Sequence, residues 1–318
     1  MSGNGHGWRI VLFTDASGAI LPHLKKLFAE KGHELAGVVT APPPKSRPMA
    51  NRYLDVVEKS ADLGIPIICS RKRKQWPKLL NALEPDLGIS MFFVWKIPTE
   101  AYEVPRFGTI SVHPSLLPKY RGPNPIGWPF LNDDGEIGVT VHYIAPEWDR
   151  GPILAQQAIQ YSDDDNGITM MPALLGATFQ TIGNALDRIR EGDPGRPQDE
   201  TCASYAPFFE LWQREIDWNR PARDIHNQVR SWPGGRDLPA GALGSLNGQR
   251  YVFDRTRLIE GLATSNPLPG TVLEWSEDCI IVQCADGPIQ IVSWSLDGEV
   301  DPSQAVTNLF KSASDPAG

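Results

Sequence analysis

The sequence contains no hydrophobic run long enough to cross a membrane. A membrane-spanning helix needs about 20 consecutive apolar residues, and no stretch of the 318 residues approaches that length. The first residues, Met1 to Trp8, show neither the basic start nor the apolar segment of a secretory signal peptide. We therefore expect a cytoplasmic protein with no membrane partner. A hydrophobic content of 41% and a charged content of 21% are typical of a globular protein, and the length allows two domains.

Cysteine is scarce, and its spacing excludes the commonest cysteine sites. The four cysteines are Cys69, Cys202, Cys279 and Cys284. No two of them have the Cys-x-x-Cys spacing of a zinc site or a redox pair. We predict free core thiols and no metal site.

Two nucleotide-binding patterns are missing as well. The first predicted strand is followed by Thr-Asp-Ala-Ser-Gly at 14–18, which differs from the Gly-x-Gly-x-x-Gly pattern of dinucleotide-binding folds. The sequence also lacks a Gly-x-x-x-x-Gly-Lys phosphate loop. These absences argue against a dehydrogenase and against a kinase.

Positive charge is in short supply. The chain has 30 Lys and Arg against 38 Asp and Glu, a net charge of −8, and residues 207–318 alone carry nine against 15. Basic residues gather at Lys45, Arg47 and Arg52 and in the run 71–74, where a solvated surface patch is the commoner role. Because phosphate contacts dominate affinity for nucleic acids, the C-terminal region is expected to bind them poorly.

The N-terminal half alternates strand-like and helical patterns. Runs rich in β-branched and aromatic residues occur at 9–14, 35–40, 65–69, 86–94 and 108–112. Helical patterns between them reach about residue 31 and cover 51–63 and 78–83. This alternation predicts an α/β fold with a mainly parallel, doubly wound, Rossmann-like sheet.

The remainder of the chain has a different organisation. Residues 138–144 and 153–159 predict a hairpin-like insertion, and 169–191 predict a long helix whose positive end would be capped by the solvated aspartates 163–165. A metal site at these aspartates is the alternative, but no histidine accompanies them. A turn-rich linker at 192–206 separates a domain at 1–191 from one at 207–318. The second domain is predicted to hold a helix at 222–232 and a small, OB-like β-barrel with strands at 242–246, 250–253, 271–275, 280–284 and 289–294.

The most informative stretch is residues 107–122, in which a short apolar strand ends at His113. Ser-Leu-Leu-Pro at 115–118 and a basic, aromatic turn closed by Gly122 come next. Substrates of open α/β sheets bind at the carboxyl ends of the strands, so His113 is expected at a site. Further on, Asp149 and Gly151 form an Asp-x-Gly turn that supplies a carboxylate.

Together these two segments resemble the folate-dependent formyltransferase family, whose members formylate methionyl-tRNA, glycinamide ribonucleotide or sugars. The signature is His-x-Ser-Leu-Leu-Pro-x-x-x-Gly at 113–122 combined with the Asp-x-Gly turn. Ile-Asp-Trp at 216–218, Pro-Gly-Thr-Val-Leu at 269–273 and the segment 286–291 are similar to the C-terminal domain of the tRNA-formylating members. The resemblance covers nearly the whole chain. It implies 10-formyltetrahydrofolate as formyl donor.

The resemblance implies a role for each residue of the motif. His113 would act as acid or base, or would donate to the oxyanion as a cation. Asp149 would orient His113 and accept the amine proton through water. Without the motif, a structural histidine at a strand end and a turn-capping aspartate are the simpler interpretations.

The chain departs from the family pattern at Ser111. Members usually carry asparagine two positions before the histidine, where the amide helps to bind the formyl oxygen. A serine hydroxyl is shorter and offers one donor, and loss of a good oxyanion donor can cost roughly 10²–10³ in rate. This departure raises a second interpretation, transfer of the formyl group to water by a 10-formyltetrahydrofolate hydrolase.

The family also implies a slot for the pterin ring, lined by main chain from the loop 91–98 and the stretch 146–149. The residues that we predict there are Met91, Phe92, Phe93, Val94, Leu116, Leu117, Pro118, Pro146, Glu147 and Trp148. A role in the core is the alternative for each of the apolar ones.

The acceptor is the open question. The acidic C-terminal region favours a small-molecule amine or hydroxylamine, such as an aminosugar or an amino-acid side chain. Methionyl-tRNA is the next hypothesis, the hydrolase is the third, and a degenerate folate-binding scaffold without activity is the fourth.

Overall fold

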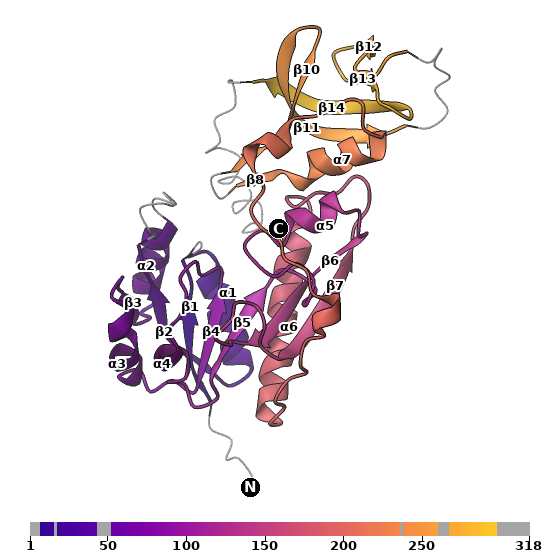
Figure 1. The fold of residues 1–318 in the computed structure, drawn as a ribbon. Helices are drawn as coiled ribbons and strands as arrows, with labels where there is room; N and C mark the ends of the chain where they lie inside the picture. The colour runs from indigo at the N-terminus through magenta and orange to yellow at the C-terminus, as the bar shows by residue number, and fades with distance from the viewer. Residues whose placement is uncertain (1–6, 16–17, 43–51, 236–237, 260–266, 298–318) are drawn as a thin grey trace. The chain divides into compact units, whose positions relative to one another are not determined.

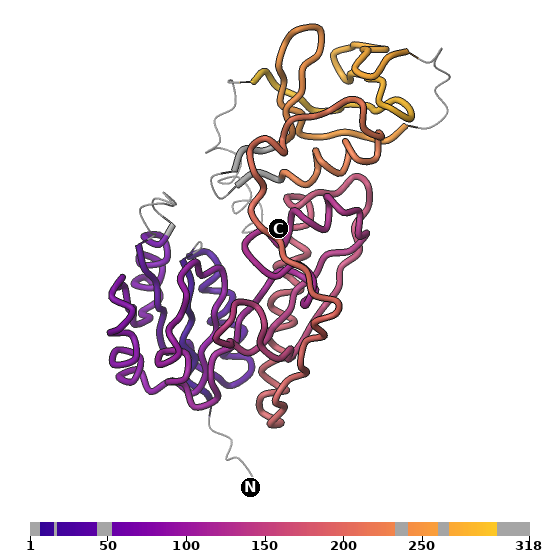
Figure 2. The backbone as a smooth tube through the Cα atoms, viewed as in Figure 1, coloured from indigo at the N-terminus to yellow at the C-terminus, as the bar shows by residue number. Residues whose placement is uncertain are grey.

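The computed structural model describes residues 7–15, 18–42, 52–235, 238–259 and 267–297. The chain divides into two compact units, and Figures 1 and 2 trace its course. The first unit comprises Met1–Arg121, Gly138–Gln157 and Leu175–Ser204, and the second comprises Gly122–Ile137, Ala158–Leu174 and Tyr205–Gly318. The predicted domain bounds, 1–191 and 207–318 with a linker at 192–206, stay a prediction.

A seven-stranded sheet has the strand order β3-β2-β1-β4-β5-β6-β7, and its first five strands run parallel. These are β1 (Arg9–Phe13), β2 (Glu34–Thr40), β3 (Ile67–Cys69), β4 (Leu87–Met91) and β5 (Thr109–His113). Each coincides with a predicted strand. The mixed α/β fold with a doubly wound sheet is therefore confirmed.

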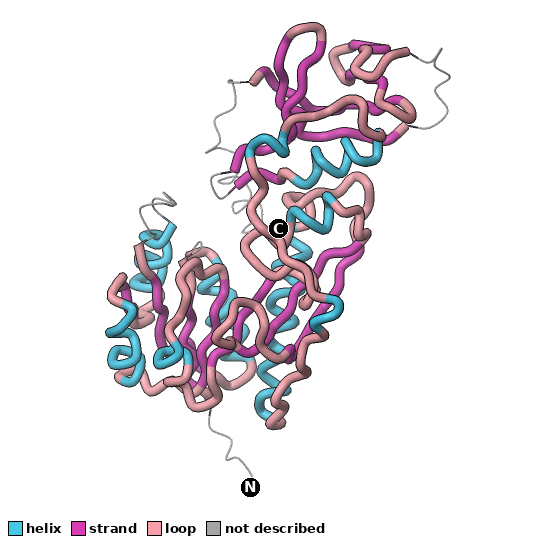
Figure 3. Tube along the Cα trace, viewed as in Figure 1, coloured by secondary structure: helices cyan, strands magenta, loops and turns pink. Residues whose placement is uncertain are grey.

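Helices cover both faces of this sheet because successive strand residues point to opposite sides. One core contains Ile10 and Leu12 of β1 and is closed by α1, α2 and α6, whereas the other contains Val11 and Phe13 and is closed by α3 and α4. Figure 3 distinguishes the helices from the strands. The helices are α1 (Ile20–Glu30), α2 (Arg52–Asp62), α3 (Trp76–Asn81), α4 (Thr99–Tyr102) and α6 (Met171–Arg190).

The two strands predicted at 138–144 and 153–159 are present as neighbours joined by the Asp149 turn, but the prediction that they form an insertion is wrong. β6 (Glu136–Tyr143) pairs antiparallel with β5, and β7 (Ile153–Gln160) lies beside β6, so both strands extend the main sheet. The reason is burial, because Ile137, Val139 and Val141 of β6 are all almost fully buried. The strand is therefore an internal one that delivers its polar side chains to the neighbourhood of β5.

The C-terminal part of the chain folds around a separate antiparallel sheet with the order β10-β11-β14-β13-β12. Its strands are β10 (Ala242–Leu246), β11 (Gln249–Leu258), β12 (Val272–Trp275), β13 (Ile280–Gln283) and β14 (Pro288–Leu296). The other elements of the second unit are α5 (Gly127–Leu131), α7 (Ala222–Ser231) and the pair β8 (Pro233–Gly235) and β9 (Leu238–Ala240). Ile225 and Val229 of α7 pack on Phe253 and Ile291 of the five-stranded sheet. All five predicted strands and the predicted helix of this region are present.

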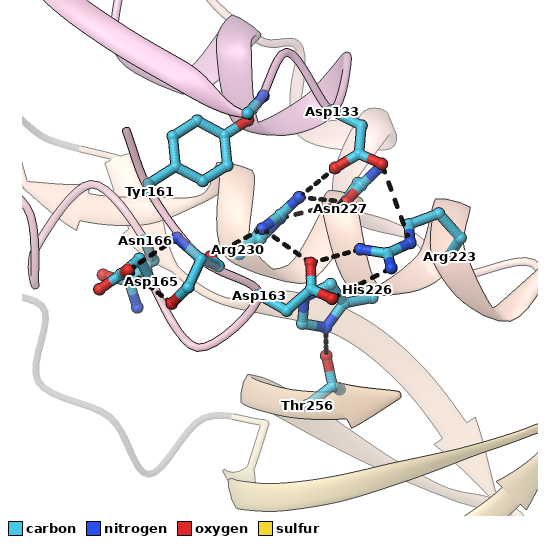
Figure 4. Close-up of polar contacts among 12 residues, drawn as sticks. Asp133, Tyr161, Asp163, Asp165, Asn166, Arg223, His226, Asn227, Arg230 and Thr256 are labelled. Atoms are coloured by element: carbon cyan, nitrogen blue, oxygen red, sulfur yellow. Dashed lines mark hydrogen bonds and ion pairs between the residues drawn. The ribbon is translucent and has the colours of Figure 1, made fainter. Parts of the chain in front are cut away.

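The aspartates 163–165 do not form a solvated helix cap. Asp163 instead makes an ion pair with Arg223 of α7 (Figure 4). Asp164 pairs with Arg255 and Arg257 of β11. Asn166 caps the turn that precedes α6, because its side-chain oxygen accepts hydrogen bonds from the N–H groups of residues 168 and 169. The arginine partners lie about 60 to 90 residues further along the chain, so the local pattern could not reveal them.

Arg230 of α7 is a buried arginine beside Asp163. Its guanidinium lies 2.6 Å from Asp133 Oδ1 and 3.6 Å from Asp163 Oδ1, and it donates to the side-chain oxygen of Asn227 (Figure 4). Its side chain is only 5% exposed. Hydrogen bonds to a charged group contribute more than neutral ones when they are buried.

Replacing Arg230 with alanine is therefore expected to lower the free energy of unfolding by about 1.5–3 kcal/mol. Arg255 provides the control, since its pair with Asp164 is half-exposed and Arg255→Ala should cost less than about 1 kcal/mol. Urea unfolding of the two variants measures both values. If both variants lost the same free energy of unfolding, burial of Arg230 would not explain its contribution.

Three sequence-based expectations concern cysteines, membrane spans and metal sites. The four cysteines are free, as predicted, but only Cys284 is buried, and Cys69 and Cys202 are exposed. In the part of the chain that the structure describes, no helix has the length and apolar character needed to cross a membrane. The same residues contain no group of three or more His, Cys, Asp or Glu side chains that could hold a metal ion.

Candidate active site

His113 is the last residue of β5 and is buried, with 6% of its surface exposed. Its Nε2 lies 2.8 Å from the main-chain oxygen of Tyr120. A carbonyl oxygen can only accept a hydrogen bond, so Nε2 carries the proton in the neutral ring. Nδ1 then holds the lone pair, and it lies 3.6 Å from Oδ1 of Asp149. Nδ1 is therefore the atom of His113 that can gain or lose a proton in the site.

The Asp149 turn has a backbone shape that its sequence makes possible. Asp149 has a φ of 57°, in the left-handed region that aspartate and asparagine enter more readily than most residues. A Cβ atom on Gly151 would lie 1.7 Å from the main-chain oxygen of Tyr143, so only glycine fits against the end of β6. The turn thus places the carboxylate of Asp149 beside the ring of His113, although the two residues are 36 positions apart in the sequence.

His142 is a second histidine of this site, and sequence reasoning missed it. In the β5–β6 pairing His142 lies opposite Ser111, and Thr140 lies opposite His113, so all four side chains point to one side of the sheet. His142 Nδ1 donates to the oxygen of Tyr143 at 2.7 Å, and Nε2 lies 4.0 Å from Oδ1 of Asp149. The available signal was a single histidine within the apolar run 137–144.

Burial makes His142 a neutral group. Removal from water lowers its pKa to about 4, an effect that the charge of Asp149 opposes and the neighbouring His113 and Arg121 reinforce. With Nδ1 protonated, Nε2 is an acceptor, and no described residue makes a hydrogen bond to it. Together with Nδ1 of His113 and the carboxylate of Asp149, it makes a group of acceptor atoms. Such a group suits a molecule that brings N–H or O–H donors, for example an amine or water.

The low pKa of His142 predicts a loss of stability in acid. The unfolded ring has a pKa of 6.5 and the folded ring about 4, so the unfolded chain binds more protons between these values. The contribution of His142 to the free energy of unfolding is therefore complete above pH 6.5. It is lost as the pH falls towards 4, by up to roughly 3 kcal/mol.

Urea unfolding of the wild type and His142→Gln between pH 8 and pH 4.5 measures this loss. The variant should keep more of its stability in acid than the wild type does. Part of the acid sensitivity should remain, because burial also lowers the pKa of His226 to about 4. Parallel curves for the two proteins would exclude His142 as the cause.

The residues predicted for the pterin slot fall into three groups. Met91 and Leu117 are buried, Pro146, Glu147 and Trp148 are exposed, and the rest are half-buried, namely Phe92, Phe93, Val94, Leu116 and Pro118. Phe93 packs against the rings of Phe13 and Trp76 in the core. The side chains of Met91, Leu117 and Phe93 thus have structural partners, so contacts of this loop with a ligand would come mainly from its main chain. That main chain is fixed by Asp15, whose Oδ2 accepts from the N–H of Val94 at 3.0 Å.

Comparison with known proteins agrees with this arrangement. The model of a family described as "Formyl transferase" matches residues 9–185, and that of the "Formyl transferase, C-terminal domain" matches residues 212–305. The chain belongs to the formyl transferase family. Its members are enzymes that transfer formyl groups, so the recognised resemblance is confirmed.

Curated relatives of the family resemble the chain over most of its length. Methionyl-tRNA formyltransferase of Pelobacter propionicus is 31% identical over 299 residues, which cover 92% of this chain and 90% of that protein. The protein of the same name from Pelotomaculum thermopropionicum is 31% identical over 294 residues, with 91% of each chain covered.

Several solved structures share the fold at lower identity. The N-formyltransferase of Helicobacter canadensis, in complex with folinic acid and dTDP-3-aminofucose, has a TM-score of 0.67 at 18% identity and covers 91% of this chain and 100% of its own. The sugar 3N-formyl transferase WlaRD, with dTDP and 5-N-formyl-THF, has a TM-score of 0.65 at 19% identity, with 93% and 100% covered. HypX of Aquifex aeolicus, in complex with tetrahydrofolic acid, has a TM-score of 0.63 at 18% identity, with 96% of this chain and 48% of HypX covered.

Proposed function

We propose that the enzyme transfers a formyl group from 10-formyltetrahydrofolate to the amine or hydroxylamine of a small molecule. The observation that carries this proposal is the placement of His113 Nδ1 3.6 Å from Asp149 Oδ1, beside a neutral His142. The presence of tetrahydrofolic acid, folinic acid or 5-N-formyl-THF in solved structures of the same fold supports a folate donor.

The residues would divide the proton transfers of this reaction between them. The amine nitrogen forms a bond to the formyl carbon, and the bond from that carbon to N10 of the folate breaks. Asp149 and His113 would take the proton that the amine loses, and His113 Nδ1 would return a proton to N10 as it leaves. Ser111 shares the His113 side of the sheet and would donate its hydroxyl hydrogen to the developing oxyanion.

The folate would lie against the main chain of the loop 91–98, with the turn 146–149 on its other side. Its ring would meet backbone N–H and C=O groups between the half-buried side chains of this loop, an environment typical of cofactor sites. We also propose that the five-stranded C-terminal sheet forms an OB-like barrel, because its strands are short and antiparallel and follow one another at short intervals.

A small acceptor is favoured by charge. Residues 207–318 carry nine Lys and Arg against 15 Asp and Glu, and several of these arginines are engaged by acidic partners within the second unit. Few cations are thus left for phosphates, on which affinity for tRNA depends. Methionyl-tRNA is the second candidate because the curated relatives that bear its name match more than 90% of the chain. Hydrolysis of the donor is the third because of Ser111.

An acceptor panel tests the proposal. The purified enzyme is given 10-formyltetrahydrofolate with no acceptor, with methionyl-tRNA, and with amines that include nucleotide-linked aminosugars and hydroxyornithine, and release of tetrahydrofolate is followed. Release that requires a small amine supports the proposal. Release that requires methionyl-tRNA, or that needs no acceptor, would replace it with the second or the third candidate.

A further inference from the structure

Gln198 lies in the segment predicted to be a linker, yet its side chain reaches the Asp149 turn. Its Nε2 donates to the main-chain oxygen of Asp149 at 2.8 Å and to that of Gly151 at 2.9 Å. These two carbonyls flank the turn on either side of Arg150. One amide group therefore closes the turn that presents the carboxylate to His113.

The orientation of the Gln198 amide is fixed by a buried arginine. Arg121 donates to Oε1 of Gln198 from Nη2 at 2.7 Å and from Nε at 3.1 Å. An arginine only donates and a carbonyl oxygen only accepts. If the amide were turned over, its NH₂ group would face the donors of Arg121 and its oxygen would face the carbonyl oxygens of Asp149 and Gly151. Arg121 is in turn held by two hydrogen bonds to the carboxylate of Glu200, at 2.9 and 2.8 Å. The Arg121 side chain is 6% exposed and that of Glu200 is 56% exposed, so only the arginine end of this pair is removed from water.

The backbone on either side of Gln198 is hydrogen-bonded to the chain after the Asp149 turn and to the loop that follows His113. Arg196 and Ile153 exchange two main-chain hydrogen bonds of 2.8 Å, which fix the segment beside the start of β7. Ser204 accepts from the N–H of Tyr120 at 2.9 Å through its hydroxyl and from the N–H of Arg121 at 3.0 Å through its carbonyl. Tyr120 is the residue whose carbonyl holds His113. Residues 196–204 thus contact the loop that orients the histidine and the turn that orients the aspartate.

We propose that Gln198 is a positioning residue that holds Asp149 at its working distance from His113, and that Arg121 and Glu200 act through it. This inference rests on the proposed function of His113 and Asp149. Gln198 touches neither reacting group, and its effect on the reaction passes through the carboxylate. Since misplacement of a catalytic group by about 1 Å can cost 10²-fold in rate, Gln198→Ala should lower kcat by about 10- to 100-fold.

A double-mutant cycle separates positioning from a general effect on folding. In the wild-type background Gln198→Ala and the nearly isosteric Gln198→Glu, which cannot donate to the two carbonyls, should both lose activity. In the Asp149→Asn background the same changes should alter kcat by less than about threefold, because the group that they position is already absent. The control is Asp199→Asn, since the Asp199 side chain bonds only to its neighbours Thr201 and Cys202 among the described residues. It should leave kcat unchanged. Equal losses in both backgrounds would overturn the proposal.

Hydrogen–deuterium exchange provides a readout that does not need turnover. Peptides that cover residues 144–154 should exchange faster in both Gln198 variants than in the wild type or in Asp199→Asn, because the turn opens when its two carbonyls lose their donor. If no acceptor supports turnover in the wild type, the proposed function fails, and exchange alone decides the role of Gln198. Unchanged exchange in this peptide would contradict that role, whatever the activity.

Discussion

Replacing His113 with asparagine is expected to reduce kcat by about 10²- to 10⁴-fold. The amide of asparagine takes the place of Nδ1 and is too short to replace the Nε2 hydrogen bond to Tyr120. An amide also cannot carry a proton between the amine and N10 of the folate. The steady-state rate of tetrahydrofolate release measures the loss. Affinity for the donor should change little, since the reacting proton contributes to the transition state more than to binding.

His23 provides a matched control for this change. It lies exposed on α1, where its ring contacts Phe179, and His23→Asn should leave both kcat and KM unchanged. A His113→Asn enzyme with more than about a tenth of wild-type kcat would show that this histidine is structural. A chain that has no turnover before the substitution would point to the scaffold hypothesis.

Replacing Asp149 with asparagine is expected to cost about 10²–10³ in kcat. The substitution keeps the size of the side chain and tolerates the positive φ of 57°, so the turn survives. What disappears is the negative charge 3.6 Å from His113 Nδ1 and 4.0 Å from His142 Nε2. Without it the proton that the amine loses has no carboxylate to accept it.

Separate values of kcat and KM distinguish this explanation from a change in binding. Asp149→Asn should lower kcat, whereas KM for 10-formyltetrahydrofolate should change little. Asp187→Asn serves as control, because Asp187 pairs with Lys31 on the half-exposed surface of α6, and it should leave both values unchanged. A variant with the wild-type kcat would exclude a catalytic role for Asp149.

The sheet and the His113 segment could be predicted because local patterns determine them. Each parallel strand is a short apolar run between turn formers, and burial on both faces needs no information from the rest of the chain. The position of His113 at the end of β5 follows from the same pattern. Its approach to Asp149 was expected only because the two motifs resemble one family, since nothing in their spacing states a distance.

The missed features depend on partners far away in the sequence. Gln198 meets the Asp149 turn across 49 residues, and Asp163 meets Arg223 across 60. Turn formers around 192–197 predicted a loop, and the chain there is indeed irregular, but its glutamine is committed to the site. His142 was missed because the strand that carries it was assigned to an insertion and not to the main sheet. In each case the local pattern described the backbone and gave no sign of the long-range contact.

The fate of the formyl carbon shows whether His113 catalyses formyl transfer to an amine. The wild type and the His113→Asn variant are given 10-formyltetrahydrofolate labelled with ¹⁴C in the formyl group, together with the acceptor that the panel selects. We expect the label in an N-formyl product, in equal amount to the tetrahydrofolate released, and almost no product from the variant. Label recovered as formate in the presence of every acceptor, or equal product from the variant, would contradict this expectation.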